Sequence, residues 1–399
     1  MIVEILQWYE LLFGKDHSLG WLALFLVFVI SYVSIMRIES RGYEPRLSND
    51  LDGQTRLVSA VVPFYDEEPR LLFKSIQSIR RQNVREIIAV TDNPSDPVVP
   101  IVRSLVDQLL VFGGRLGKRQ CLAAGFGKTS GEFVLFVDSD TVLTDGCVQE
   151  MLRAFNPDVG GVSTRHQIHD GQMKSMCGAY SSIIEDNRWT LDQALSKFGK
   201  LTVIDGRCCM YRRRAIEEFI TSNYFLKERA NGHIFTTGDD RQLTRFLNST
   251  GWKTRVSGGV AFTSAPSCFS KFLKQQLRWL RSGYHYHLAD IKERFRGTSA
   301  LYTFSQMAYF LSPWLFLVVI FHDVLFVPPP DGIITPPIYA LLVAIVGSSF
   351  VSAIQQLILR SKVTFRYFFH VGFLGLVILL PISIYAFFTR KRQHLWLTR

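Results

Sequence analysis

Asp138 and Asp140 are the residues whose types and spacing point most directly to chemistry. They flank Ser139 immediately after the apolar run 132–137. If that run is a strand, both carboxylates lie near its end, and carboxylate oxygens are ligands that Mg²⁺ and Mn²⁺ prefer. A divalent metal held there would neutralise a diphosphate leaving group. Two acids at such a junction can also be solvated turn residues, so the metal interpretation needs support from other residues.

A basic loop that contains glycines, residues 113–119, ends in Lys118 and Arg119. It precedes a predicted helix over Gln120–Gly127. Such a loop suits phosphate, with the two basic side chains as counter-charges. The loop lacks the Walker spacing, and a flexible basic surface turn would have the same composition.

Asp239 and Asp240 form a second acidic pair, about a hundred residues downstream, in the run Gly-Asp-Asp-Arg. One of them could act as the general base for a hydroxyl nucleophile. Asp240 could instead cap the helical turn predicted over Arg241–Leu247. The two interpretations are compatible.

Gln275, Arg278 and Trp279 lie in the segment Ser270–His287, which mixes basic and aromatic residues. On its pattern alone this segment is an amphipathic helix at a membrane interface. A helix in that position could also roof a site in a domain beside it.

The elements that would position these residues predict an α/β unit over residues 55–264. Helical spacing of apolar residues after Pro69 lies between two strand-like runs. The order strand, helix, strand predicts a mostly parallel sheet with helices on its faces. Ligands bind beyond the carboxyl ends of such strands, where Asp66, Asp92 and Asp138 fall. The strands are predicted at Leu57–Val62, Glu86–Thr91 and Glu132–Val137.

The composition predicts a chain with membrane and soluble parts. Hydrophobic residues make up 48% and the mean hydropathy is +0.14, yet charged residues are an ordinary 20%. Residues 1–40 are predicted as an interfacial segment and an anchor, because Leu19–Met36 carries no charge and the arginines after it place the next unit in the cytosol. Residues 265–299 are predicted as interfacial and 300–399 as transmembrane. The apolar segments there are Ala300–Phe321, Pro336–Leu359 and Tyr367–Thr389.

These segments predict a multi-pass integral protein of the plasma membrane with a cytosolic catalytic domain and membrane lipids as partners. A third full crossing by the last segment would leave the basic C-terminus outside. The last segment is therefore bent or re-entrant around Pro381, or the number of crossings differs by one.

The net charge of +11 could serve nucleic acid, anionic lipid or an anionic substrate. Much of the excess lies beside the apolar segments and in the loop 115–119. That distribution suits lipid and diphosphate better than a nucleic-acid duplex, so no nucleic-acid partner is expected. The six cysteines form no C-x-x-C pair, which indicates neither a zinc site nor a disulfide framework.

Taken together and in their order along the chain, these motifs resemble those of the processive family 2 glycosyltransferases, above all hyaluronan synthases and related fungal polysaccharide synthases. The resemblance runs from Val62 to the last residue. The motifs that carry it are Val62-Pro63-Phe64-Tyr65-Asp66-Glu67, Asp92, Gly117-Lys118-Arg119, Val137-Asp138-Ser139-Asp140-Thr141, Gly238-Asp239-Asp240-Arg241, Gln275-x-x-Arg278-Trp279 and Trp396-x-Thr398-Arg399.

The resemblance implies a GT-A fold and a donor site for a UDP-sugar. Tyr65, Asp66 and Asp92 would hold the nucleoside. Lys118 and Arg119 would assist the diphosphate.

The resemblance also implies a metal and an inverting transfer to a growing polysaccharide or other glycan acceptor. Asp140 with Asp138 would bind Mg²⁺ or Mn²⁺. Asp240 would be the base, with Asp239 as the second candidate. A single displacement of this kind needs no covalent nucleophile.

Gln275, Arg278 and Trp279 would complete the substrate site, with Arg278 at the diphosphate and Trp279 over the donor or acceptor pocket. Near the acceptor, hyaluronan synthases carry Ser-Gly-Pro-Leu where this chain reads Asp205-Gly206-Arg207-Cys208. The acceptor-facing surface therefore differs, and the sugar stays open.

Three functions follow from the sequence. The main one is polymerisation of UDP-sugars with translocation of the product. A second is the transfer of one sugar to a lipid or short glycan. A third is a non-catalytic membrane scaffold, against which the retention of every acidic motif argues.

Overall fold

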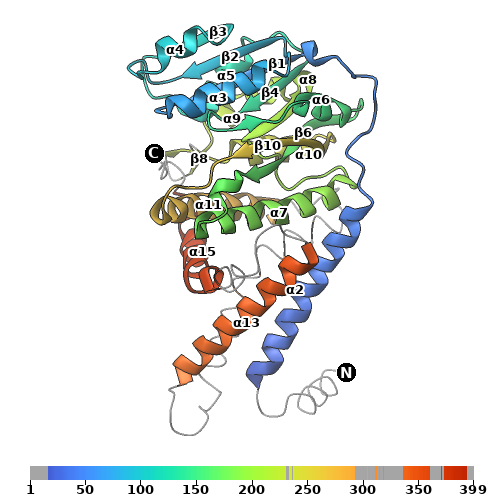
Figure 1. The fold of residues 1–399 in the computed structure, drawn as a ribbon, viewed down its shortest axis with the longest axis vertical. Coiled ribbons are helices and arrows are strands. Elements are labelled where there is room, and N and C mark those ends of the chain that lie inside the picture. The colour runs from blue at the N-terminus through green and yellow to red at the C-terminus, as the bar shows by residue number, and fades with distance from the viewer. Residues whose placement is uncertain are drawn as a thin grey trace.

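The computed structural model describes residues 17–230, 233–235, 237–292, 336–359 and 373–392, together with residues 303, 307, 311, 314, 318 and 370. Its centre is a mixed sheet (Figure 1). The strands are β1 (Val58–Phe64), β2 (Glu86–Thr91), β3 (Gln108–Val111), β4 (Phe133–Val137), β5 (Val142–Leu143), β6 (Val159–Ile168), β7 (Cys208–Arg212) and β10 (Lys253–Thr263), and β8 (Arg229–Ala230) pairs with β9 (His233–Ile234) apart from the sheet.

Helices cover both faces of the sheet and extend below it. They are α2 (His17–Arg41), α3 (Pro69–Arg80), α4 (Val99–Arg103), α5 (Lys118–Phe126), α6 (Cys147–Arg153), α7 (Met176–Ser196), α8 (Arg213–Ile220), α9 (Asn223–Leu226), α10 (Asp239–Ser249), α11 (Phe269–Lys292), α13 (Pro336–Leu359) and α15 (Leu380–Phe388). Short helical turns are η1 (Thr55–Leu57), η2 (Asp170–Gln172) and the π-helical η3 (Leu374–Leu379).

The three predicted strands are confirmed as β1, β2 and β4, and the predicted helix after Pro69 is confirmed as α3. The helix predicted over Gln120–Gly127 is α5, which begins two residues earlier. β1 pairs in parallel with β2 and with β4, and β2 pairs in parallel with β3. The carboxyl ends of these strands therefore meet at one edge of the sheet, as expected.

β6 also pairs in parallel with β10, so four of the seven neighbouring strand pairs are parallel and the sheet is mostly parallel, as predicted, with β7 and β5 reversed. The full order is β3-β2-β1-β4-β7-β6-β10-β5. β7 runs antiparallel to both β4 and β6, and β5 runs antiparallel to β10. Every residue of β7 is buried, like a central parallel strand, so its residue pattern carries no sign of its direction.

The sheet is buried between two apolar layers. On one face α3 and α6 pack through residues such as Leu72, Ile76 and Met151. On the other face α5, α8 and α10 pack through residues such as Leu122 and Leu247. The two layers leave the strand ends open, where the polar residues of the predicted site lie.

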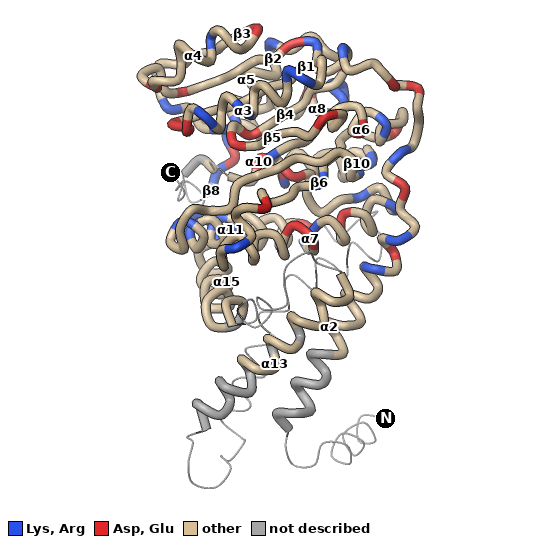
Figure 2. The backbone as a smooth tube through the Cα atoms, in the orientation of Figure 1, with Lys and Arg blue, Asp and Glu red and all other residues tan. Residues whose placement is uncertain are grey.

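α7 and α11 form a layer beneath the sheet, in contact through the rings of Tyr180 and Phe272 at 5.5 Å. α2 packs against α7, and α13 runs beside α2 away from the sheet (Figure 1). Most of the Lys, Arg, Asp and Glu residues lie on the sheet and the helices around it (Figure 2). The described part of α13 carries none of them. Among the residues that the structure describes, we find no helix with the length and uninterrupted apolar character that a bilayer crossing demands.

The sequence allowed a bend or a re-entrant segment around Pro381. The helix type changes there, because η3 is π-helical and α15 begins with Pro381 in its first turn. Most of the predicted segment Ala300–Phe321, and the motif of Trp396, Thr398 and Arg399, lie outside the described residues. The divisions of the chain at 40, 55, 264 and 299 stay predictions.

Gly125 on α5 faces the sheet at close range. A Cβ atom there would lie 2.4 Å from Val61 Cγ1 and 3.1 Å from Val90 Cγ2. We expect Gly125→Ala to lower the free energy of unfolding by about 1–3 kcal/mol, because the helix must move away from the strands. Urea denaturation measures the difference. Gly127→Ala is the matched control, since a Cβ at that right-handed C-cap meets only ordinary contacts at 3.6 Å. Equal losses in the two variants would contradict this packing.

Candidate active site

A cleft of about 1040 Å³ opens where the parallel strands end. It is large for a single small ligand, since typical ligand pockets measure roughly 300–1,000 Å³. The cleft brings together all of the predicted site residues except Arg119. Those that line it are Tyr65, Asp66, Asp92, Lys118, Asp138, Asp140, Asp239, Asp240, Gln275, Arg278 and Trp279.

Asp92 holds the glycine-containing loop in place. Its Oδ2 accepts hydrogen bonds from the backbone N–H groups of Leu116 and Gly117, at 2.8 and 2.7 Å. Gly117 has φ 90°, a left-handed conformation that favours glycine. Asp92 therefore shapes the loop that precedes α5, in addition to facing the cleft.

Tyr65 and Asp66 follow β1 at the same end of the cleft. Asp66 has a positive φ of 50°, and its N–H donates to Asp96 Oδ2 at 2.8 Å. The guanidinium of Arg115 lies 4.3 Å from the centre of the Tyr65 ring. Arg115 was not among the predicted site residues. In the sequence, only the position of Arg115 within the basic loop 113–119 indicated a role in the site.

Lys118 lies between the two acidic pairs. Its Nζ is 2.6 Å from Asp138 Oδ1 and 3.8 Å from Asp239 Oδ2. Burial by itself lowers the pKa of Lys118, but the two carboxylates outweigh burial and raise it above its usual value. Lys118 is therefore a permanent cation at the centre of the cleft.

Asp138 is fixed from two sides. Its N–H donates to the carbonyl of Arg207 at 2.8 Å. The next residue, Ser139, donates from Oγ to Glu67 Oε2 at 2.6 Å. Burial raises the pKa of Asp138 more than Lys118 lowers it. Asp138 and Asp140 both face the cleft, so their oxygen atoms suit a hard divalent cation.

Asp239 and Asp240 are the first two residues of α10. The N-cap is Gly238, with φ 78°, so the prediction that Asp240 caps the helix is wrong. Asp240 Oδ1 does accept the N–H of Arg241 at 2.7 Å. Burial raises the pKa of Asp240, and the Asp239 carboxylate raises it further. The amino end of a helix stabilises negative charge, which offsets part of this repulsion.

The structure differs from the sequence prediction at Arg119. Its side chain is 1% exposed and does not line the cleft. Successive residues on a helix point about 100° apart, so Arg119 faces the interior while Lys118 faces the cleft. The guanidinium donates to the carbonyls of Phe225 and Thr237 and to the side chains of Glu228, Gln242 and Tyr286, at 2.6 to 3.1 Å. It thereby joins α5 to α10 and α11.

α11 forms one wall of the cleft, through Gln275, Arg278 and Trp279. The sequence allowed this helix to roof a neighbouring site, and its residues do line the cleft. The Trp279 ring lies 5.9 Å from the guanidinium carbons of Arg188 and of Arg207.

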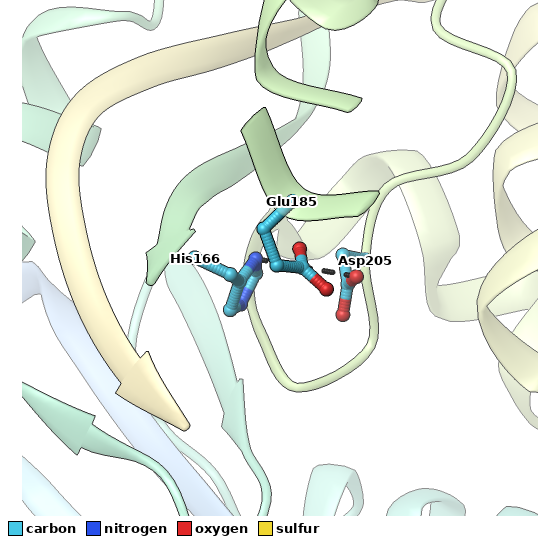
Figure 3. A group of neighbouring side chains, drawn as sticks. All are labelled: His166, Glu185 and Asp205. Atoms are coloured by element: carbon cyan, nitrogen blue, oxygen red, sulfur yellow. Dashed lines mark ion pairs between the residues drawn. The ribbon is translucent and has the colours of Figure 1, made fainter. Parts of the chain in front are cut away.

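Figure 3 shows a group of three side chains that no sequence motif predicted as a site. His166, Glu185 and Asp205 are all buried, with ligand-type atoms within 4.8 Å of one another. They come from β6, α7 and the loop before β7 (Figure 3). Both carboxylates are paired with arginines, so the group is an ion-pair network rather than an open set of metal ligands.

The comparisons with known proteins agree with this geometry. A model of glycosyl transferase family 2 matches residues 59–220. These residues are a family 2 glycosyltransferase domain. The domain includes Asp92, Lys118, Asp138 and Asp140, and its structure is an α/β fold of the GT-A type with a mixed sheet.

Whole-chain relatives extend this identification. An N-acetylglucosaminyltransferase of Azorhizobium caulinodans is 28% identical over 368 residues, which cover 88% of this chain and 90% of the relative. A hyaluronan synthase of Streptococcus pyogenes serotype M3 is 26% identical over 314 residues, which cover 75% of this chain and 73% of the relative. The family and these relatives identify the chain as a transferase rather than a scaffold.

Among solved structures, the mannosyltransferase PcManGT from Pyrobaculum calidifontis, in complex with GDP-Man and Mn²⁺, is similar with a TM-score of 0.62. The match covers 91% of this chain and 99% of that chain at 15% identity, and it shows a shared fold.

Arg119→Met tests the buried network behind the cleft. The change removes the Arg119 guanidinium from the Glu228 carboxylate, which is 11% exposed and keeps only its contacts with His285 and Tyr286 among the partners that the structure describes. We expect a loss of about 3–5 kcal/mol in the free energy of unfolding, because an uncompensated buried charge is costly. Guanidinium denaturation gives the value.

Arg81→Met is the control, because the Arg81–Asp145 pair is 55% and 86% exposed. Its loss should stay below about 1 kcal/mol. A similar small loss for Arg119→Met would show that the network contributes little.

Proposed function

We propose that this protein is an inverting, metal-dependent glycosyltransferase that transfers a sugar from a UDP-sugar to a growing polysaccharide. One observation carries the proposal. Lys118 joins Asp138, at the end of β4, to Asp239, at the start of α10, so two acidic motifs that are far apart in sequence face one cleft.

In this proposal Tyr65, Asp66 and Asp92 hold the nucleoside at one end of the cleft. Lys118 and Arg278 supply positive charge to the diphosphate. Asp138 and Asp140 hold Mg²⁺ or Mn²⁺, which neutralises the charge that develops on the leaving group when the metal is bound. Arg119 takes no part at the diphosphate, and it instead positions α5 against α10 and α11.

Asp240 is the general base. It takes the proton of the acceptor hydroxyl as that oxygen attacks the anomeric carbon and the bond to UDP breaks. One displacement inverts the configuration, so no covalent nucleophile is required. Asp239 is the second candidate, and its carboxylate lies 3.8 Å from Lys118.

Membrane embedding and translocation of the product are part of the proposal. Their support is the uncharged runs Leu19–Met36 and Pro336–Leu359, together with large apolar side chains on α13 that are exposed. Val346, Phe350 and Leu357 are 65%, 60% and 65% exposed. Exposed apolar surface of this kind suits lipid or another apolar partner. We place the protein in the plasma membrane, with several crossings and the transferase domain in the cytosol.

The function is tested by release of UDP from UDP-GlcNAc, UDP-GlcA or UDP-Glc with Mn²⁺, followed by digestion of the product with hyaluronidase, chitinase or cellulase. We expect Asp240→Asn to lower kcat by about 10²–10⁴-fold with little change in the donor KM, because only proton removal is lost. EDTA should abolish the wild-type activity, and Mn²⁺ should restore it.

Asp145→Asn, an exposed aspartate that does not line the cleft, is the control and should keep full activity. Absence of UDP release with every donor would refute the transferase. A product extended by one sugar only would instead support transfer to a lipid or short glycan.

The pH dependence of kcat provides a second test. Burial and Asp239 raise the pKa of Asp240 above its usual 3.8. A base works only when deprotonated, so kcat should fall as the pH decreases through this raised pKa. A kcat that stays constant down to pH 3.8, with the fold verified by circular dichroism, would exclude Asp240 as the base.

A further inference from the structure

Four charged side chains close the end of the cleft opposite Tyr65, and we call them the four-charge network: Glu185, Arg188, Asp205 and Arg207. The sheet order sets this placement, because β1, β4 and β7 are consecutive neighbours. Tyr65 follows β1, Asp138 follows β4, and Arg207 precedes β7. A donor with its nucleoside at Tyr65 and its diphosphate near Asp138 therefore points its sugar toward this network.

Within the network, every carboxylate oxygen of Glu185 and Asp205 accepts a hydrogen bond from Arg207. Arg207 Nη2 lies 2.8 Å from each oxygen of Glu185, and Arg207 Nε and Nη2 lie 2.9 and 2.7 Å from the two oxygens of Asp205. Arg188 pairs with Asp205 and lies 3.7 Å from Glu185 Oε2. Two guanidinium groups are thus balanced by two carboxylates.

Three titratable groups of the network and its surroundings carry no positive charge at neutral pH. Burial alone would raise the pKa of Glu185, but Arg207 and Arg188 lower it to about 2, so Glu185 is anionic at neutral pH. Burial lowers the pKa of His166 well below its usual value, so its ring is neutral. Asp192, near Arg188, has its pKa raised to about 7 by burial and contributes at most negative charge.

The network offers the cleft an aromatic face and N–H donors. The carboxylates of Glu185 and Asp205 are 4% and 8% exposed, whereas Arg188 and Arg207 are 23% and 14% exposed. All four residues line the cleft, and the two guanidinium groups, which are the more exposed, lie next to the Trp279 ring. Hydroxyl or acetamido oxygens of a sugar can accept from these N–H groups while the sugar ring packs on the indole.

A carboxylate on the ligand would fit this surface poorly. It would compete for guanidinium groups that already neutralise two buried carboxylates. Withdrawing either arginine leaves a buried anion uncompensated, which is strongly unfavourable. A cation bound to His166, Glu185 and Asp205 (Figure 3) would have to displace the same arginines, so we assign no metal there.

The loop that carries Asp205 and Arg207 also lies next to residues of the proposed reaction. A Cβ atom on Gly206 would lie 3.1 Å from Asp240 Cβ, and the Arg207 carbonyl accepts the N–H of Asp138. A sugar on Trp279 therefore lies beside the base.

We propose that Trp279 and the four-charge network form the acceptor subsite, and that it selects an uncharged hexose or N-acetylhexosamine as the sugar that carries the attacking hydroxyl. A uronate at that position is disfavoured. The proposal rests on the proposed function, since it assigns the acceptor of the same reaction.

The test uses matched acceptors, hyaluronan oligosaccharides that end either in N-acetylglucosamine or in glucuronate, with each of the three UDP-sugars as donor. We expect acceptor kcat/KM, from UDP release, to be at least about 10-fold higher for the neutral end with the best donor. Glu185→Gln keeps the shape of the side chain but leaves a guanidinium uncompensated. It should move the ratio toward the uronate end by about 10-fold.

Glu150→Gln is the matched control. Glu150 also pairs with two arginines, Arg46 and Arg153, but it does not line the cleft, so the ratio should stay at the wild-type value. If Glu185→Gln does not fold, competition between the two oligosaccharides for the wild-type protein, measured by saturation-transfer NMR, decides the preference.

The possible results distinguish failure of the proposed acceptor preference from failure of the proposed transferase activity. No UDP release with any donor would remove the transferase and the subsite together. UDP release with equal or better use of the uronate end would overturn the subsite alone. A folded Glu185→Gln variant with an unchanged ratio would show that the network does not set the preference.

Discussion

The ion pair between Lys118 and Asp138 is the interaction on which the cleft depends. Asp138, Asp239 and Asp240 come from two elements that share no local sequence, and their carboxylates repel one another. Lys118, at 2.6 Å from Asp138 and 3.8 Å from Asp239, supplies the cation that lets these carboxylates stay close. Without it, desolvation and like charge would both favour separation of α10 from the end of β4.

The buried hydrogen bonds of Arg119 stabilise the position of the helix that carries Lys118. Arg119 follows Lys118 directly, yet it is buried and bonded to groups of α10 and α11. The first turn of α5 thus has two roles: Lys118 places a cation in the cleft, and Arg119 connects α5 to α10 and α11 beneath the cleft. Because both residues belong to α5, a displacement of α10 would strain both networks.

The two ends of the cleft that we propose for the donor and the acceptor differ in how their basic side chains are neutralised. Lys118 and Arg278 line the end where we propose that the diphosphate of the donor binds. At the other end, Arg188 and Arg207 are already neutralised by buried carboxylates. In the proposed reaction the donor end thus suits an anionic leaving group and the acceptor end suits an uncharged sugar. The proposed base, Asp240, lies close to the backbone of Gly206, since a Cβ atom on Gly206 would be 3.1 Å from Asp240 Cβ.

The sequence by itself determined the local elements and most of the predicted residues that line the cleft. Alternating strands and helices, with acids at strand ends, identified β1, β2, β4, Asp92 and Asp138, because hydrophobic period and turn residues are local properties. Tertiary structure alone decided the direction of β7, the burial of Arg119 and the pairing of Glu185 with Arg207. Each of these depends on a partner distant in sequence, such as Gln242, which is 123 positions from Arg119. A charged side chain looks the same in a sequence whether it faces solvent, a ligand or a buried counter-charge, and only the packed fold distinguishes the three.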